Sequence, residues 1–228
     1  MGGRTGGPPW EQPFTPAERR LIARLDSPSR VQRFLNELPY NHERPPAGGT
    51  LRSFRTVLRT GSAHCLEAAL AAAVILEAHD YPPLVLSFES IDGLDHVLFV
   101  YRRAGRWGSI ARSRDPGLHG RRAAFATPRA LALSYVDPYV DLTGRITGYA
   151  VVDLNILGRY DWRLSTRNVW AVERALLNYP HRRIRTSDRR IDRLRARYRA
   201  FLDRHPGQKP LDYRGRERWS ALPSEFAR

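Results

Sequence analysis

The stretch Gly61-Ser-Ala-His-Cys65-Leu-Glu-Ala-Ala-Leu-Ala-Ala-Ala-Val-Ile-Leu76 begins with small residues typical of a loop and continues as an almost unbroken apolar run. A helix that is apolar on nearly every side predicts a buried central helix, which we expect to extend to about His79. Cys65 is the only cysteine of the chain and falls in the first turn of this helix. Free backbone N–H groups and the positive end of the helix dipole favour a thiolate at that position.

A histidine lies at the start of a strand that follows this helix. Residues 84–88 predict a first strand, and Leu94-Asp-His96-Val-Leu-Phe-Val-Tyr101 alternates as a second one. An imidazole on a neighbouring strand can take the proton of a thiol and hold it as imidazolium. Cys65 and His96 are therefore the expected nucleophile and base.

The rest of the chain predicts helices before and after these strands. A Thr15 cap followed by Pro16 indicates one helix, and Ser27-Pro28 begins another that stops at Pro39. Further expected elements are a short helix at 51–58, a strand at 107–111, a helix from Thr127-Pro128 to about Tyr135, a strand at 144–153 and an amphipathic helix from Asp188 to about His205.

This order of elements predicts an α+β fold. The cysteine helix packs on an antiparallel sheet, and extra helices lie at the N- and C-terminal ends. We expect three parts in the chain. These are a disordered Gly- and Pro-rich segment at 1–14, a main domain at 15–160, and a basic helical extension at 161–228.

Composition is that of a soluble globular protein. Hydrophobic residues make up 42% of the 228 residues. No apolar run approaches the roughly 20 residues of a membrane span, and the N-terminus lacks the apolar core of a secretory signal. A single cysteine cannot form an intrachain disulfide, which is compatible with a reducing interior. We therefore expect a cytoplasmic protein with no membrane partner.

The net charge of +15 comes almost entirely from arginine, because Lys209 is the only lysine among 38 basic residues. Residues 181–228 carry 15 Lys and Arg against 6 Asp and Glu, whereas residues 61–101 hold six acids and no Lys or Arg. No DNA- or RNA-binding motif accompanies the basic residues. We do not expect a nucleic-acid partner. Nucleic-acid binding through the basic residues at 181–228 is a weaker alternative to the two functions described below.

Three segments resemble the transglutaminase-like superfamily, and in particular its small bacterial members of unknown role: Ala63-His64-Cys65-Leu-Glu67, Tyr81-Pro-Pro-Leu-Val-Leu86 and Asp95-His96-Val-Leu-Phe-Val-Tyr101. The resemblance covers roughly residues 27–155 and is clearest over 60–111. It implies a papain-like α+β core. It also implies that Cys65 and His96 occupy the nucleophile and base positions.

The third member of the family's catalytic set departs from the usual pattern. The family places an aspartate on the strand after the histidine, a few residues beyond a tryptophan. Trp107 is present here, but the matching position falls near Ala111. The nearest polar residues are Ser113 and Asp115 in the following loop. Asp115 is the candidate for orienting His96, and Ser113 is a weaker alternative.

Other polar residues near the cysteine have less defined roles. The Cys65 N–H is one expected oxyanion donor, and Asn41 is a candidate for a second. We expect His64 to point away from the thiol, because adjacent helical residues do not face each other. A metal site built from Cys65, His96 and His119 lacks the usual ligand spacing, so no metal or other cofactor is expected.

Two functions remain in competition. The first is a transglutaminase-like cysteine enzyme that forms an acyl-thioester from an amide or ester carbonyl, followed by hydrolysis or acyl transfer to an amine. Its substrate would be a peptide, a protein or a small amide. The second is a catalytically inactive binding or scaffold protein of the same fold. The missing strand aspartate favours the second function, the intact cysteine–histidine pair favours the first, and the oligomeric state stays open.

Overall fold

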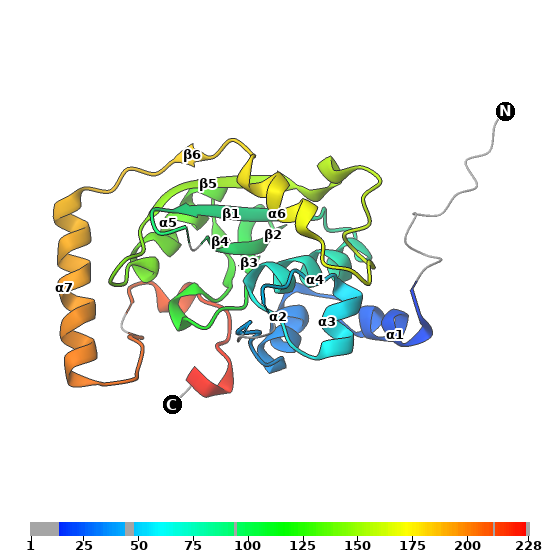
Figure 1. Ribbon diagram of the computed structural model, residues 1–228, viewed down its shortest axis with the longest axis horizontal. Coiled ribbons are helices and arrows are strands. Elements are labelled where there is room, and N and C mark those ends of the chain that lie inside the picture. Colours follow the sequence, from blue (N-terminus) through cyan, green and yellow to red (C-terminus); the bar gives the residue numbers. More distant parts are fainter. Residues whose placement is uncertain (1–13, 44–47, 94, 212, 227–228) are drawn as a thin grey trace.

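The computed structural model describes residues 14–43, 48–93, 95–211 and 213–226, so the expected disordered segment lies almost wholly outside the described residues. Within these ranges the chain forms an α+β fold of seven helices and six strands (Figure 1). The helices are α1 (Pro16–Arg24), α2 (Pro28–Glu37), α3 (Phe54–Thr60), α4 (Cys65–Glu77), α5 (Pro128–Tyr139), α6 (Trp170–Leu177) and α7 (Asp188–Arg204). The strands are β1 (Leu84–Ser90), β2 (Val97–Arg103), β3 (Arg106–Ile110), β4 (Arg121–Phe125), β5 (Ile146–Asp153) and β6 (Arg182–Arg183).

The strands form one sheet in the order β4-β3-β2-β1-β5-β6, and every neighbouring pair is antiparallel. In the central strand β1, Val85 pairs with Phe99 of β2 on one side and with Val152 of β5 on the other. This confirms the antiparallel sheet. The edge strands β4 and β6 were not expected, because their arginine-rich sequences lack the apolar alternation that marks a strand.

Both faces of the central strands β1 and β2 are buried, which gives three layers. Val85, Val97 and Phe99 lie in one apolar cluster with α4, whereas Leu86 and Leu98 lie in a second cluster with α5. Successive side chains of a strand point to opposite faces, so each central strand contributes to both clusters. The sheet therefore lies between α4 on one face and α5 on the other.

The helix α4 is the buried centre of the first cluster, as predicted. Every residue from Leu66 to Leu76 is buried. The helix begins at Cys65, and α2 and α3 pack against it. Because the body of α4 offers no polar surface, its N-terminal turn is where backbone N–H groups remain for other partners.

Residues after 160 contribute to the same cluster. Trp162, Leu164 and Val172 are buried with the residues of α4, and the Val169 N–H donates to the Leu51 carbonyl at 2.7 Å. The helix α6 was not expected. The expected helix at 188–205 is present as α7, which stands at one end of the molecule with only Ile191 buried (Figure 1).

A buried amide side chain joins α2 to the end of β3. Gln32 donates from Nε2 to the Ala111 carbonyl at 2.9 Å and accepts the Ala111 N–H through Oε1 at 3.0 Å. Gly120 packs against this pair. A Cβ added there would collide with Gln32 Oε1 and would lie 2.6 Å from the Ser109 carbonyl oxygen. The Gln32 amide therefore extends the strand pairing at the point where the loop 112–120 begins.

Gly120→Ala tests this packing. We expect it to lower the free energy of unfolding by about 1–3 kcal/mol, because the added methyl must displace Gln32 or the backbone of Ser109. Gly49→Ala is the matched control, since the nearest atom to an added Cβ there is 3.5 Å away, on Trp170. Equilibrium denaturation in urea measures both changes. Equal free energies of unfolding for the two variants would contradict the tight packing of Gly120 against Gln32 and Ser109.

Candidate active site

The thiol lies at the first position of α4, directly after its N-cap residue. His64 is the N-cap, with an extended backbone (φ −88°, ψ −176°) and a side chain whose Nδ1 accepts the Leu66 N–H at 3.2 Å. In return, Glu67 Oε2 accepts the His64 N–H at 3.0 Å. His64 therefore lies outside the helix, and the rule for adjacent helical residues does not apply to it. Its ring lines the same cleft as the Cys65 thiol, so the expectation that it points away was wrong.

Two imidazoles set the protonation of the thiol. Burial by itself raises the pKa of Cys65, but hydrogen bonds with His64 and His96 and the positive charge of both rings lower it. The net result is a pKa well below the ordinary value of a thiol. A thiol in such surroundings is a nucleophile at neutral pH.

His96 is almost completely buried and lies directly before β2. Its Nε2 lies 3.0 Å from the Leu118 carbonyl oxygen, which can only accept, so Nε2 carries the hydrogen. The ring is parallel to that of Phe88, with centroids 6.4 Å apart. In the neutral ring Nδ1 is therefore free of a proton and available to the thiol of Cys65.

The candidates for orienting His96 lie elsewhere in the loop after β3. Asp115 pairs with Lys209 and accepts no hydrogen bond from His96 among the described residues. The Ser113 hydroxyl accepts the Asp115 N–H at 3.0 Å. The Leu118 carbonyl occupies the place where a carboxylate was expected. A backbone carbonyl leaves no mark in the residue types, so this partner of His96 could not be predicted from the sequence.

The oxyanion candidate Asn41 is also engaged elsewhere. Its Nδ2 donates to Thr50 Oγ1 at 2.7 Å and to Glu67 Oε2 at 3.1 Å. Tyr40 instead lines the same cleft as Cys65. Burial raises the pKa of Tyr40, and the negative charge of Cys65 raises it further. Tyr40 is thus a residue at the thiol that the sequence reasoning missed, since a tyrosine after a helix carries no distinctive pattern.

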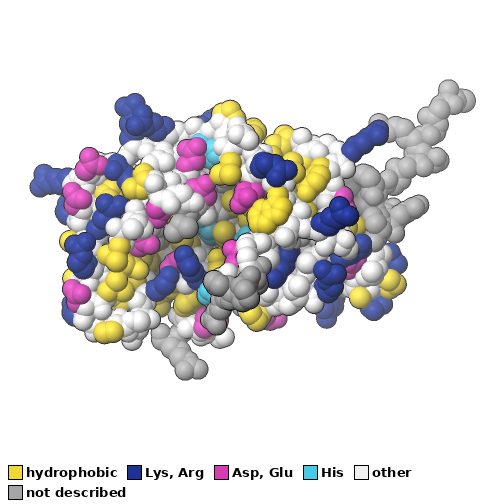
Figure 2. Space-filling model, in the orientation of Figure 1, with side chains coloured by type: hydrophobic (Ala, Val, Ile, Leu, Met, Phe, Trp, Pro, Cys, Tyr) yellow, Lys and Arg dark blue, Asp and Glu magenta, His cyan; other side chains and the backbone are white. Residues whose placement is uncertain are grey.

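Cys65 and His96 open into a cleft of about 310 Å³. Its walls come from distant parts of the chain, including the C-terminal residues Tyr198, Lys209 and Tyr213. Burial and the charge of Arg114 lower the pKa of Lys209 to about 8. In the space-filling view, histidine side chains lie near the middle of the face, with basic and acidic side chains both around them and along the edges (Figure 2). Residues of the basic C-terminal extension therefore form part of the candidate site.

His119 is buried and bonds to the main chain of its own loop. Its Nε2 bonds to the Ser113 carbonyl at 2.9 Å, and burial together with the charge of Arg112 lowers its pKa to about 3. Across the described ranges, no group of three or more His, Cys, Asp or Glu side chains could hold a metal ion. Within the same ranges, none of the helices is both long and apolar enough to cross a membrane.

Comparisons with known proteins add no family assignment. No model of a known protein family matches the chain, and a search of curated proteins also found no match. The chemistry of the site therefore rests on its own geometry.

The lowered pKa of Cys65 predicts an unusual pH dependence of alkylation by iodoacetamide. A lowered pKa keeps the thiolate as the pH falls, so we expect the rate to change by less than about threefold between about pH 8 and about pH 6. The same protein unfolded in urea is the control, because its thiol should slow by about tenfold per pH unit below its ordinary pKa of about 8.5. A folded protein that follows the unfolded profile would refute the lowered pKa.

Proposed function

We propose that this protein is a transglutaminase-like cysteine enzyme with a papain-like arrangement of helix and sheet. The observation that carries the proposal is the Cys65 thiol at the first position of α4, in one cleft with the buried imidazole of His96. The other nitrogen of His96 is held by the Leu118 carbonyl at 3.0 Å. This combination supplies a nucleophile and an oriented base in one cleft.

In the first step, the thiolate attacks the carbonyl carbon of an amide or ester. The S–C bond forms, and the carbonyl oxygen takes up the negative charge near the Cys65 N–H. Tyr40 lines the same cleft, and its hydroxyl can donate to the same oxygen. When the oxyanion collapses, the C–N or C–O bond breaks and an imidazolium beside the sulfur protonates the leaving group.

In the second step, an acceptor attacks the thioester. Nδ1 of His96 takes the proton of a water molecule or of a primary amine as the new bond forms. The Cys65 thiolate then leaves. Water as acceptor gives hydrolysis, and an amine gives acyl transfer.

An activated ester, p-nitrophenyl acetate, tests the acyl-thioester. We expect wild type to acquire one acetyl group on Cys65, seen by mass spectrometry, and to release p-nitrophenol continuously. Cys65→Ala removes both signals, and His96→Asn slows turnover by about 10²–10⁴-fold because the second step loses its base. Labelling of Cys65 that leaves turnover unaffected by His96→Asn would refute the assignment of the base.

Asp115→Asn tests whether His96 is oriented by the Asp115 carboxylate or by the Leu118 carbonyl. Because Nε2 of His96 already donates to the Leu118 carbonyl, we expect turnover to change by less than about tenfold, far less than in His96→Asn. A loss as large as that of His96→Asn would restore Asp115 to the orienting role.

A catalytically inactive binding protein of the same fold is the second candidate. It is favoured by one observation, namely that no carboxylate of the described residues contacts His96. If the protein is such a binding protein, p-nitrophenyl acetate acetylates Cys65 no faster in the folded protein than in the same protein unfolded in urea.

A further inference from the structure

The only lysine of the sequence lies in the same cleft as the only cysteine. Lys209, Cys65 and His96 all line the cleft of about 310 Å³. A cleft of this volume is at the lower end of the range for pockets that hold small molecules, so the groups on its walls face one shared space. The fold therefore brings a primary amine, a thiol and an imidazole together from distant parts of the chain.

The segment that carries Lys209 is fixed against the loop 112–120. Tyr213 packs on Gly117, where an added Cβ would lie 2.9 Å from the tyrosine ring. The same ring contacts that of Trp219, with centroids 5.8 Å apart. Trp219 is buried, and the guanidinium of Arg121 lies 4.7 Å from its ring centroid. The position of Lys209 therefore follows from packing of the residues that come after it.

The amine of Lys209 is attached to the loop that orients His96. Its Nζ pairs with the carboxylate of Asp115, and its side chain is 37% exposed. The Asp115 carbonyl accepts the Leu118 N–H at 3.0 Å, and the Leu118 carbonyl accepts from Nε2 of His96 at 3.0 Å. Amine and base are therefore held by one short stretch of backbone.

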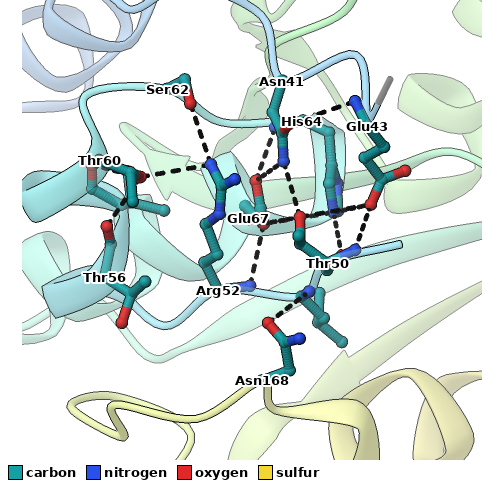
Figure 3. A network of polar contacts seen from close by, with 12 residues as sticks. Asn41, Glu43, Thr50, Arg52, Thr56, Thr60, Ser62, His64, Glu67 and Asn168 are labelled. Carbon is teal, nitrogen blue, oxygen red and sulfur yellow. Dashed lines mark hydrogen bonds and ion pairs between the residues drawn. The ribbon is translucent and has the colours of Figure 1, made fainter. Parts of the chain in front are cut away.

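The part of the cleft that carries Cys65 is fixed by a buried polar network (Figure 3). Glu67, in the same first turn of α4, is completely buried. It accepts hydrogen bonds from the His64 N–H at 3.0 Å, the Thr50 hydroxyl at 2.9 Å and the Asn41 amide at 3.1 Å. The thiol and the amine are thus both presented to the cleft by anchored segments.

The surroundings of Lys209 favour a neutral amine at a lower pH than for an ordinary lysine. Burial and the charge of Arg114 lower the pKa of Lys209 to about 8, against about 10.4 for a free side chain. The pair with Asp115 acts in the opposite direction, because a carboxylate favours the ammonium form. The other charged or titratable groups that line this cleft on neighbouring segments include Asp141, Tyr198 and Tyr213. At about pH 8 a large fraction of Lys209 therefore carries a nucleophilic lone pair.

We propose that Lys209 is an acyl acceptor within the enzyme itself, so that an acyl group on Cys65 passes to Nζ of Lys209. The inference rests on the proposed function and names one acceptor for its second step. The lone pair of Nζ attacks the thioester carbonyl, the C–N bond forms, the C–S bond breaks and Cys65 leaves as a thiolate. The proton of the amine passes to Nδ1 of His96. The product is an amide, which removes the positive charge from the pair with Asp115.

Acetylation by p-nitrophenyl acetate at about pH 8 tests this transfer. Neutral hydroxylamine is added afterwards, because it cleaves thioesters and leaves amides intact. We expect wild type to acquire a hydroxylamine-resistant acetyl group on Lys209, located by peptide mapping, at least about tenfold faster than Cys65→Ala, since transfer within the cleft is intramolecular. Alanine is the best helix former, so Cys65→Ala keeps the first turn of α4.

A lysine placed outside the cleft is the matched control. Arg193 is exposed on α7 and is not among the described residues that line the cleft. In the double variant Lys209→Arg with Arg193→Lys, the introduced lysine can react only with the free ester. We expect Cys65→Ala to change its acetylation by less than about twofold. An introduced lysine that depends on Cys65 as strongly as Lys209 does would overturn the inference.

The inference and the proposed function fail in different measurements. If Lys209 is acetylated equally fast in wild type and Cys65→Ala, the inference is wrong, while a thioester at Cys65 and loss of turnover in His96→Asn still support the enzyme. A thioester whose acetyl group never reaches Lys209 has the same meaning. If Lys209→Arg forms no thioester at Cys65, the proposed function itself is refuted.

Discussion

One buried carboxylate, that of Glu67, ties the first turn of the central helix to the chain that precedes it. The four donors it accepts come from the helix N-cap and from the segment between α2 and α3. Leaving such donors buried without an acceptor would cost about 1–3 kcal/mol each, so the segment can hardly detach while the helix stays in place. The position of the thiol therefore depends on a polar network at the one end of an otherwise apolar helix.

The loop that faces this network is fixed by two buried arginines. Arg121 donates to the carbonyl oxygens of His119 and Gly117, at 2.6 and 2.7 Å, and its guanidinium lies over the ring of Tyr135. Arg112 donates to the Leu38 carbonyl at 3.0 Å. Because Arg121 holds the backbone on both sides of Leu118, the carbonyl that receives His96 has little freedom to move. Orientation of His96 thus comes from the main chain.

The apolar part of the molecule could be predicted from the sequence far better than the polar part. The run after Cys65 and the alternation from Val97 to Tyr101 predict a buried helix and a strand, and both are present. Strands β4 and β6 could not be predicted, because edge strands are held by backbone bonds to neighbours rather than by an apolar pattern. At the site, the cysteine and His96 are specific residue types at expected positions. The roles of Leu118 and Tyr40 depend on where a carbonyl and a hydroxyl come to lie, which only the three-dimensional fold determines.

Lys209 gives the molecule an unusual chemical surface. It is the only lysine among 38 basic residues, and its amine is paired with Asp115 inside the cleft. The exposed cations elsewhere are guanidinium groups, which are protonated at every physiological pH and do not react with acyl donors as amines do. For an enzyme that joins acyl groups to amines, such an exterior would offer almost no side-chain acceptor of its own. Copies of this chain could then work at high concentration without becoming joined to one another through their side chains.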